Sequence, residues 1–385
     1  MNVILFDSNR SNFYPLSYTR PIAEFRIGIL TIKEKWEHYY ENVSVSTEDY
    51  LADKYPITKQ KENLWIDSSV LPSKELITEL NSLRNGELLE SNDKVIAFKN
   101  SSFDYKKLNK ISTSVNFDSL NNIWDIFSDN SREIEKDFKL VVKGRKTSAL
   151  KSSNTVIGKK VFIEKGAKVS CSILNAENGP IFIGKNAEVM EGTIIRGPFA
   201  MGENSVLKMG TKIYGPTTLG PYCKVGGEVN NSVFFGYSSK SHDGFLGNSV
   251  IGEWCNLGAD TNNSNLKNNY TEVKLWNYEM EKFKKTGLQF CGLVMGDHSK
   301  CGINTMFNTG TVVGVSANIF GSGFARNFIP SFSWGGASGF QLYKLPKVFE
   351  VASKVFERRK LNFDVVEQSI LSQVYDMTKR YRNEQ

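Results

Sequence analysis

A repeat of six residues runs through the second half of this chain and constrains its fold more than any other feature. Every sixth residue from Ile183 to Val225 is apolar, and the same step recurs from Phe245 to Leu257 and from Met295 to Ile319. Small residues recur four places after the apolar ones, at Ala187, Thr193, Ser205, Thr211, Thr217, Cys223 and Cys255. A period of six fits neither a helix nor an alternating strand. It predicts a parallel β-helix, in which short strands and tight turns stack coil upon coil around a narrow core.

Glycine placement predicts where this architecture begins. Of the 31 glycines, only Gly28, Gly86 and Gly144 lie in the first 150 residues. We therefore expect an α/β domain over residues 1–145, the β-helix over residues 150–325, and a capping segment with C-terminal helices over residues 326–385. The tail is expected to cap the open end of the solenoid, which would protect its last strands.

The repeat lapses in two places, and loops on a rigid scaffold often carry function. Residues 236–244 are predicted to bulge outward, and residues 262–289 form a longer insertion. In the first 145 residues we expect strands over 3–6 and 64–66, helices over 30–40, 73–84 and 120–138, and a hairpin that turns at Asn92-Asp93.

Composition excludes several classes of protein. A charged fraction of 23% and a hydrophobic fraction of 40% are ordinary for a globular chain. The net charge of +7 is not gathered into basic runs, so we expect no nucleic-acid partner. No secretory signal or membrane-length apolar stretch is seen, and the five cysteines form no CxxC pair. A cytoplasmic location with reduced thiols is expected.

Three stretches of the second half together resemble the acetyltransferase motif of the bifunctional GlmU family. They are Glu228 to His242, Gly258-Ala259-Asp260-Thr261, and Asn265. That family makes UDP-N-acetylglucosamine with an N-terminal nucleotidyltransferase domain and a left-handed β-helix acetyltransferase domain. The likeness is closest to the Bacteroidetes-type branch of GlmU-type sugar nucleotidyltransferases. It implies a homotrimer, with His242 as the catalytic base, Glu228 and Lys240 at the acceptor site, and Asn265 as a substrate contact. The motif departs from the family at Asn230 and Leu266, so the acceptor pocket is altered.

A histidine suits this role because the attack of an amine on a thioester releases a proton that a neutral imidazole can take near neutral pH. A backbone N–H or the Asn265 amide could stabilise the oxyanion. The alternative for His242 is a solvated loop residue. The resemblance also places acetyl-CoA along the coils of two segments, Cys301–Thr305 and Ala317–Gly321. The cofactor contacts that it implies are Thr305, Ala317, Gly321, Lys300 and Arg326, although the two basic residues are as readily solvated surface charges.

The N-terminal likeness rests on Pro15-Leu16-Ser17 and Arg20-Pro21, which match part of the nucleotide-binding loop of sugar nucleotidyltransferases. The glycines of that loop are absent, and with them the backbone cradle for phosphate. Arg20 and Arg26 remain as candidate phosphate contacts. Asp67 is the candidate Mg²⁺ ligand, or else a turn or cap residue.

These observations predict an acetyl-CoA-dependent N-acetyltransferase that acts on an amino-sugar phosphate such as glucosamine 1-phosphate, with a reduced nucleotidyltransferase-like domain. The alternatives are a sugar-1-phosphate nucleotidyltransferase that uses UTP and whose β-helix mainly trimerises it, and a non-catalytic assembly protein. The missing glycine loop counts against the former, and His242 and Asn265 count against the latter.

Overall fold

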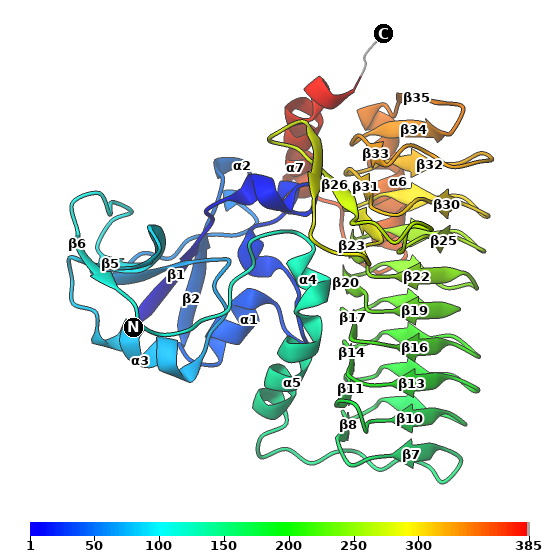
Figure 1. The fold of residues 1–385 in the computed structure, drawn as a ribbon, viewed down its shortest axis with the longest axis horizontal. Helices are drawn as coiled ribbons and strands as arrows, with labels where there is room; N and C mark the ends of the chain where they lie inside the picture. Colours follow the sequence, from blue (N-terminus) through cyan, green and yellow to red (C-terminus); the bar gives the residue numbers. More distant parts are fainter. Residues whose placement is uncertain (383–385) are drawn as a thin grey trace. The chain divides into compact units, whose positions relative to one another are not determined.

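The computed structural model describes residues 1–382 and divides into two compact units (Figure 1). The first unit comprises Met1–Phe13, Thr19–Phe25 and Leu30–Ile123. The second comprises Tyr14–Tyr18, Arg26–Ile29 and the chain from Trp124 onward. The sequence predicted a boundary near residue 145. By its contacts, the segment with helices α4 (Asp125–Ser128) and α5 (Asn130–Val141) instead belongs with the second unit.

The first unit is built on one six-stranded sheet with the order β2-β1-β3-β5-β4-β6. Its strands are β1 (Asn2–Phe6), β2 (Asn42–Ser46), β3 (Asn63–Asp67), β4 (Glu87–Ser91), β5 (Lys94–Asn100) and β6 (Asn109–Ser112). Strands β2, β1 and β3 are parallel, and β4 and β5 form the predicted antiparallel hairpin. Strands β2 and β6 were not predicted. Ladders of backbone hydrogen bonds give these short polar segments a place at the two edges of the sheet.

Helices α1 (Ile32–Glu37), α2 (Asp49–Ala52) and α3 (Lys74–Ser82) complete this unit. Thr31 and Glu34 form a capping box at the start of α1, and the side chain of Ser73 caps α3 as predicted. Trp36 on α1 is fully buried and donates a hydrogen bond of 3.1 Å to the carbonyl of Val70. The hydrogen bond from Trp36 joins α1 to the segment that follows the carboxyl end of β3.

The second unit contains the predicted left-handed parallel β-helix, whose walls are three sheets in which the strands of successive coils pair in parallel. Sheet 1 consists of β7 (Thr155–Ile157), β10 (Ile173–Asn175), β13 (Ile194–Arg196), β16 (Lys212–Tyr214), β19 (Glu228–Asn230) and β22 (Phe245–Gly247). Sheet 2 consists of β8 (Val161–Ile163), β11 (Ile181–Ile183), β14 (Phe199–Met201), β17 (Thr217–Leu219), β20 (Val233–Gly236), β23 (Val250–Glu253), β28 (Leu293–Met295), β31 (Thr311–Val313) and β33 (Phe328–Ile329).

Sheet 3 consists of β9 (Lys168–Val169), β12 (Glu188–Val189), β15 (Val206–Leu207), β18 (Lys224–Val225), β21 (Ser239–Lys240), β24 (Asn256–Leu257), β29 (Lys300–Cys301), β32 (Asn318–Ile319), β34 (Ser333–Gly336) and β35 (Gly339–Leu342). Two further strands, β25 (Asn262–Asn263) and β30 (Met306–Phe307), pair with each other. The apolar residues at the repeat positions point into the lumen and form one continuous core. The exception is Phe245, which is half-buried, because Leu246 takes the lumen position in that coil. The small residues are buried as expected, and Ser205, for example, donates a hydrogen bond to the carbonyl of Gly220.

The turns from sheet 2 to sheet 3 carry a column of stacked aromatic rings. Tyr222 stacks on Tyr237, Tyr237 on Trp254 at 4.3 Å, and Trp254 on Phe356 at 4.0 Å between ring centroids. Phe356 belongs to α6 (Leu345–Glu357). This helix therefore packs against the side of the solenoid rather than over its end. The edge of β34 is instead paired by β35, in an antiparallel hairpin.

The two predicted breaks in the repeat have different outcomes. Residues 236–244 do not bulge, because they form the end of β20, the strand β21 and an ordinary turn. The long insertion does project, as a hairpin of β26 (Lys274–Asn277) and β27 (Lys282–Lys285). After α6, the chain ends in α7 (Val365–Met377) and a short 3-10 helix, Lys379–Tyr381. No helix within residues 1–382 has the length and apolar character that a membrane crossing requires.

Candidate functional site

His242 is exposed in the turn that joins sheet 3 to sheet 1, between β21 and β22. We call the column of such turns the His242 corner. The turn of His242 has four residues, Ser241–Gly244, whereas the turn of the preceding coil has only two, Gly226 and Gly227. A Cβ on Gly226 would lie 2.5 Å from the carbonyl oxygen of Ser241. The two glycines therefore allow a short turn to pass close to the next one, and His242 lies beside this shortened step.

Glu228 lies close to this turn, as the resemblance implies. It is the first residue of β19, and its backbone N–H donates to the carbonyl of Gly244 at 3.2 Å. Its carboxylate accepts a hydrogen bond of 2.5 Å from the hydroxyl of Tyr214. Burial, and secondly this hydrogen bond, raise the pKa of Tyr214, so the phenol stays protonated and continues to donate. Glu228 is thus a half-buried, oriented carboxylate one coil from His242.

Lys240 has a different position from the one that the resemblance implies. It occupies the lumen position that Val225 and Leu257 occupy in the neighbouring coils, and only 1% of it is exposed. Its ammonium donates to the carbonyls of Gly226 at 3.1 Å and His242 at 2.9 Å. Desolvation lowers the pKa of Lys240 to about 8, against smaller opposing effects of Asp243, Cys301 and Asp260. The side chain therefore supports the His242 turn from inside and does not face an acceptor.

Asn265 lies at another corner of the solenoid, at the root of the insertion. Its side-chain amide donates a hydrogen bond of 2.8 Å to Asn248, in the turn that follows β22. Strand β22 separates this turn from His242. Within one chain the structure therefore does not bring Asn265 and His242 together.

Two asparagines beside this root were not singled out from the sequence. Asn263 is 4% exposed, and its amide both accepts from the N–H of Gly247 at 2.9 Å and donates to the carbonyl of Gly247 at 3.1 Å. Asn262 similarly accepts from the N–H of Phe245 at 2.8 Å. These side chains take the place of the backbone ladder where the insertion interrupts sheet 1.

The expected coenzyme contacts are divided between the lumen and the surface. Thr305 and Ala317 are 5% and 1% exposed, and the Thr305 hydroxyl donates to the carbonyl of Gly302 at 2.9 Å. Their side chains are therefore part of the inner wall. Gly321 is exposed and lines a cavity of about 520 Å³ at the His242 corner, together with Asp260 and Ile303.

Exposed apolar side chains around this cavity were missed in the sequence because the hexad pattern reports only the inward positions. The exposed fractions of Ile303 and Phe324 are 70% and 53%, and Met306 and Phe320 are also exposed. Apolar side chains at a solenoid surface indicate a binding surface rather than a core.

Lys300 and Arg326 lie on different faces. Lys300 is half-buried on sheet 3, and its ammonium donates to the carbonyl of His298 at 2.9 Å. Desolvation lowers its pKa, so it is a structural contact more than a surface charge. Arg326 is exposed just before β33 and lines two cavities beside the insertion hairpin.

In the first unit, polar side chains gather at the carboxyl ends of β1 and β3, which is where open α/β sheets bind ligands. Asp7 accepts hydrogen bonds from Arg10 at 2.6 Å and from the N–H of Ile22 at 2.9 Å. Asp67 accepts from Ser8 at 2.5 Å and from the N–H of Ser69 at 2.8 Å. The carboxylates thus hold the loop in which the glycines are missing.

This arrangement does not favour the expected magnesium site. Asp67 is 1% exposed, and each of its oxygens already accepts a hydrogen bond. Within residues 1–382, no three His, Cys, Asp or Glu side chains gather as metal ligands. Arg20 is 4% exposed in the same unit. Arg26 belongs to the second unit, where it donates to the carbonyls of Phe235 and Ile29, so it acts there as a structural contact.

Comparisons with known proteins give information on each half of the chain. The polysialic-acid-specific acetyltransferase NeuO has 13% identity and a TM-score of 0.27, over 50% of this chain and 87% of its own. The N-acyltransferase AntD from Bacillus cereus has 15% identity and a TM-score of 0.22, over 53% of this chain and 91% of its own. Similarity this low does not establish the activity of this chain. The comparison with curated proteins gives no match. Residues 3–146 match the family described as sugar nucleotidyl transferase, which is a family of transferases.

Proposed function

We propose that this protein is an acetyl-CoA-dependent N-acetyltransferase that acts on an amino-sugar phosphate in sugar-nucleotide synthesis. The observation that carries the proposal is the exposed imidazole of His242 on a rigid corner of the solenoid. The carboxylate of Glu228, oriented by Tyr214, lies on the adjacent coil, and a cavity with apolar rims lies along the same corner. A hexapeptide solenoid with these features resembles the acetyltransferase half of the GlmU family.

In the proposed reaction, the amine of the sugar attacks the thioester carbonyl of acetyl-CoA. A carbon–nitrogen bond forms, the carbon–sulfur bond breaks, and His242 takes the proton that the amine loses and returns one to the thiolate. Glu228 binds the acceptor by a hydrogen bond to a sugar hydroxyl or to the amine. Asp260, Ile303 and Gly321 line the cavity in which the pantetheine arm would lie.

The position of Asn265 supports a homotrimer in this proposal. Since Asn265 and His242 lie at different corners of one chain, a complete site would take Asn265 from a neighbouring copy. Light scattering at micromolar concentration tests the assembly, and a monomeric mass would contradict it. The reaction itself is tested with acetyl-CoA and glucosamine 1-phosphate, by following free thiol. No thiol release with any of a panel of amino-sugar phosphates would exclude the proposed activity.

A second candidate function is favoured by the match of residues 3–146 to the sugar nucleotidyl transferase family. We propose that the first unit binds a sugar nucleotide at the carboxyl ends of β1 and β3 but transfers nucleotides slowly, because the phosphate cradle has no glycines. Little pyrophosphate is expected from UTP, Mg²⁺ and N-acetylglucosamine 1-phosphate. Rapid pyrophosphate release would overturn this expectation, and its loss in Arg20→Ala would then assign the phosphate contact to that arginine.

A further inference from the structure

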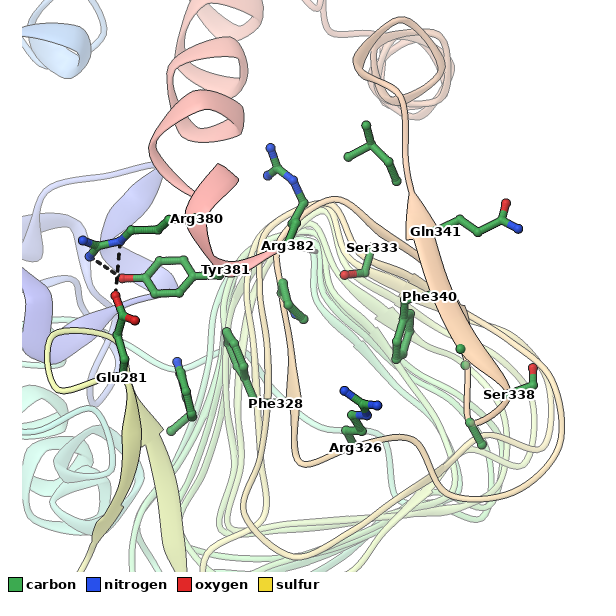
Figure 2. A pocket seen from close by; sticks show the side chains of 16 residues that line it. Glu281, Arg326, Phe328, Ser333, Ser338, Phe340, Gln341, Arg380, Tyr381 and Arg382 are labelled. Carbon is green, nitrogen blue, oxygen red and sulfur yellow. Dashed lines mark hydrogen bonds and ion pairs between the residues drawn. The ribbon is translucent and has the colours of Figure 1, made fainter. Parts of the chain in front are cut away.

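The hairpin formed by β26 and β27, which the proposed reaction does not use, forms one wall of a cavity of about 620 Å³. The opposite wall is the segment Arg326–Phe328, at the start of the last coil. A second cavity of about 510 Å³ adjoins it and shares Trp276, Arg326 and Phe328 (Figure 2). We call the two together the hairpin groove. All of its residues belong to the second unit.

The groove combines flat aromatic surfaces with positive charge. Trp276 stacks on Phe328 with ring centroids 4.2 Å apart, and Phe283, which is 42% exposed, contacts Trp276 edge-on at 5.4 Å. Lys267, Lys274 and Arg326 line the larger cavity, whose lining includes no carboxylate. Such a lining suits a planar ring joined to an anion.

The basic side chains differ in how strongly the protein already engages them. Arg380 pairs with Glu281 at 3.6 Å, and Arg382 donates to the carbonyl of Tyr375 at 2.8 Å. Within residues 1–382, no hydrogen bond or ion pair engages the guanidinium of Arg326 or the ammonium of Lys274. Figure 2 shows Arg326 below Phe328 and Phe340 in the same cavity. An exposed guanidinium beside stacked rings is well placed to bind phosphate with two N–H groups.

We propose that the hairpin groove binds a nucleoside phosphate, with its base against Trp276 and Phe283 and its phosphate on Arg326 and Lys274. The biological role of this site rests on the proposed function. Within that function, two ligands carry a base joined to a phosphate. One is the 3′-phosphoadenosine end of coenzyme A, and the other is the nucleotide of a sugar nucleotide. The binding step itself requires neither catalysis nor His242.

The test is isothermal titration of the full-length protein with adenosine 3′,5′-bisphosphate, UDP and inorganic phosphate. We expect at least one nucleotide to bind with a Kd below about 1 mM, and to bind more weakly in raised salt. Arg326→Gln and Lys274→Gln should each weaken that binding about tenfold or more, and Phe283→Leu should weaken it less. Arg196→Gln, which changes an exposed arginine of sheet 1, is the matched control and should bind normally. All of these substitutions are at exposed positions, so thermal melting should show folded variants.

The outcomes separate the two sources and the two proposals. Preference for the bisphosphate assigns the groove to coenzyme A, and preference for UDP assigns it to a sugar nucleotide. Equal binding of inorganic phosphate, or nucleotide binding that survives Arg326→Gln, would overturn the proposal. His242→Ala should bind nucleotide normally. Failure of acetyl transfer with intact nucleotide binding would therefore count only against the proposed reaction.

Discussion

The ammonium nitrogen of Lys240 lies 2.9 Å from the carbonyl oxygen of His242, to which it donates a hydrogen bond from inside the solenoid. A charged group thus occupies a lumen position that is apolar in the adjacent coils. A buried ammonium is costly unless it is hydrogen-bonded, and here two backbone carbonyls accept from it. Burial of the ammonium lowers the stability of the coil, and its hydrogen bonds hold the exposed turn of His242 in place.

The first prediction concerns the pH dependence of this cost. Burial lowers the pKa of Lys240 from 10.5 to about 8, so the unfolded chain binds the proton more tightly. The penalty of roughly 3 kcal/mol is present in full below pH 8 and disappears as the pH rises to 10.5. Denaturant unfolding from pH 7.5 to 9.5 should show the parent gaining stability relative to Lys240→Met. Lys212→Met, at an exposed position, is the control. A parent-minus-variant difference that stays constant with pH would contradict the assignment.

His242→Ala should leave assembly and nucleotide binding intact and lower turnover about 10²–10⁴-fold, the usual effect of removing a positioned base. The loss should shrink as the pH rises, because more of the amine is then already deprotonated. Thiol release from acetyl-CoA across pH 6 to 9 measures both effects. His38→Ala removes an exposed histidine at the end of α1 and should be silent. A His242→Ala enzyme within about threefold of the parent would end the catalytic assignment.

Asn265→Ala should slow the same reaction without changing the shape of its pH profile, because an amide does not titrate in this range. If Asn265 acts across a subunit boundary, mixed trimers offer a sharper test. Combining the impaired His242→Ala and Asn265→Ala chains should restore part of the activity, since some sites then receive both intact side chains. Absence of any recovery in proven mixed trimers would contradict a shared site.

Because the short turn at Gly226-Gly227 passes close to the turn of His242, one added methyl group there should lower the free energy of unfolding. Gly227 has φ +73°, and a Cβ there would lie 2.8 Å from the Cα of Asp243. Gly210 has nearly the same backbone conformation, with φ +70°, but a Cβ there would meet nothing within 4 Å. Gly210→Ala should cost about 1–2 kcal/mol of left-handed backbone strain. Gly227→Ala should cost about 1–3 kcal/mol more, from overpacking. Equal unfolding free energies for the two variants would show that the turns are not packed together as described.

Asn263→Leu should destabilise the solenoid although Leu is the more usual lumen residue. The substitution leaves the N–H of Gly247 without its acceptor, whereas the Gly247 carbonyl keeps the hydrogen bond from the Ser249 hydroxyl. A buried orphan group of this kind costs about 1–3 kcal/mol. Asn256→Leu, at an exposed position on sheet 3, should change the unfolding free energy by less than about 0.5 kcal/mol. A stable Asn263→Leu protein would mean that the backbone finds other partners.

The solenoid could be predicted from the sequence because its lumen repeats one requirement many times, and no single residue decides it. Strand β2 could also have been found, since Val43 and Val45 alternate with Ser44 and Ser46. That alternation spans only four residues, so it is a weaker signal than the continuous apolar run of β1. The residues near His242 were harder to predict. Lys240 is a charged residue at a lumen position, where the repeat predicts an apolar side chain. The local sequence does not indicate that two backbone carbonyls accept hydrogen bonds from its ammonium.

The corner residues required information that no single hexad contains. His242 lies beside a two-residue shortening in the coil before it, fifteen positions earlier in the chain. Arg326 and Trp276 are separated by a hairpin and several strands, and they line one groove only because the insertion folds back along the stack. Periodicity reports inward positions, whereas the candidate ligand contacts lie at outward positions and in loops.

The shortened turn at Gly226-Gly227 has the character of a dislocation in a layered crystal. Two residues are missing from one layer, yet the strands of the next layer return to register, as the pairing of Glu228 with Phe245 and of Val225 with Lys240 shows. Because each coil pairs only with its neighbours, the mismatch ends within one edge of one layer and does not spread. A stacked fold of this kind can therefore change the outline of one corner, and with it the chemistry displayed there, while the rest of the stack keeps its form.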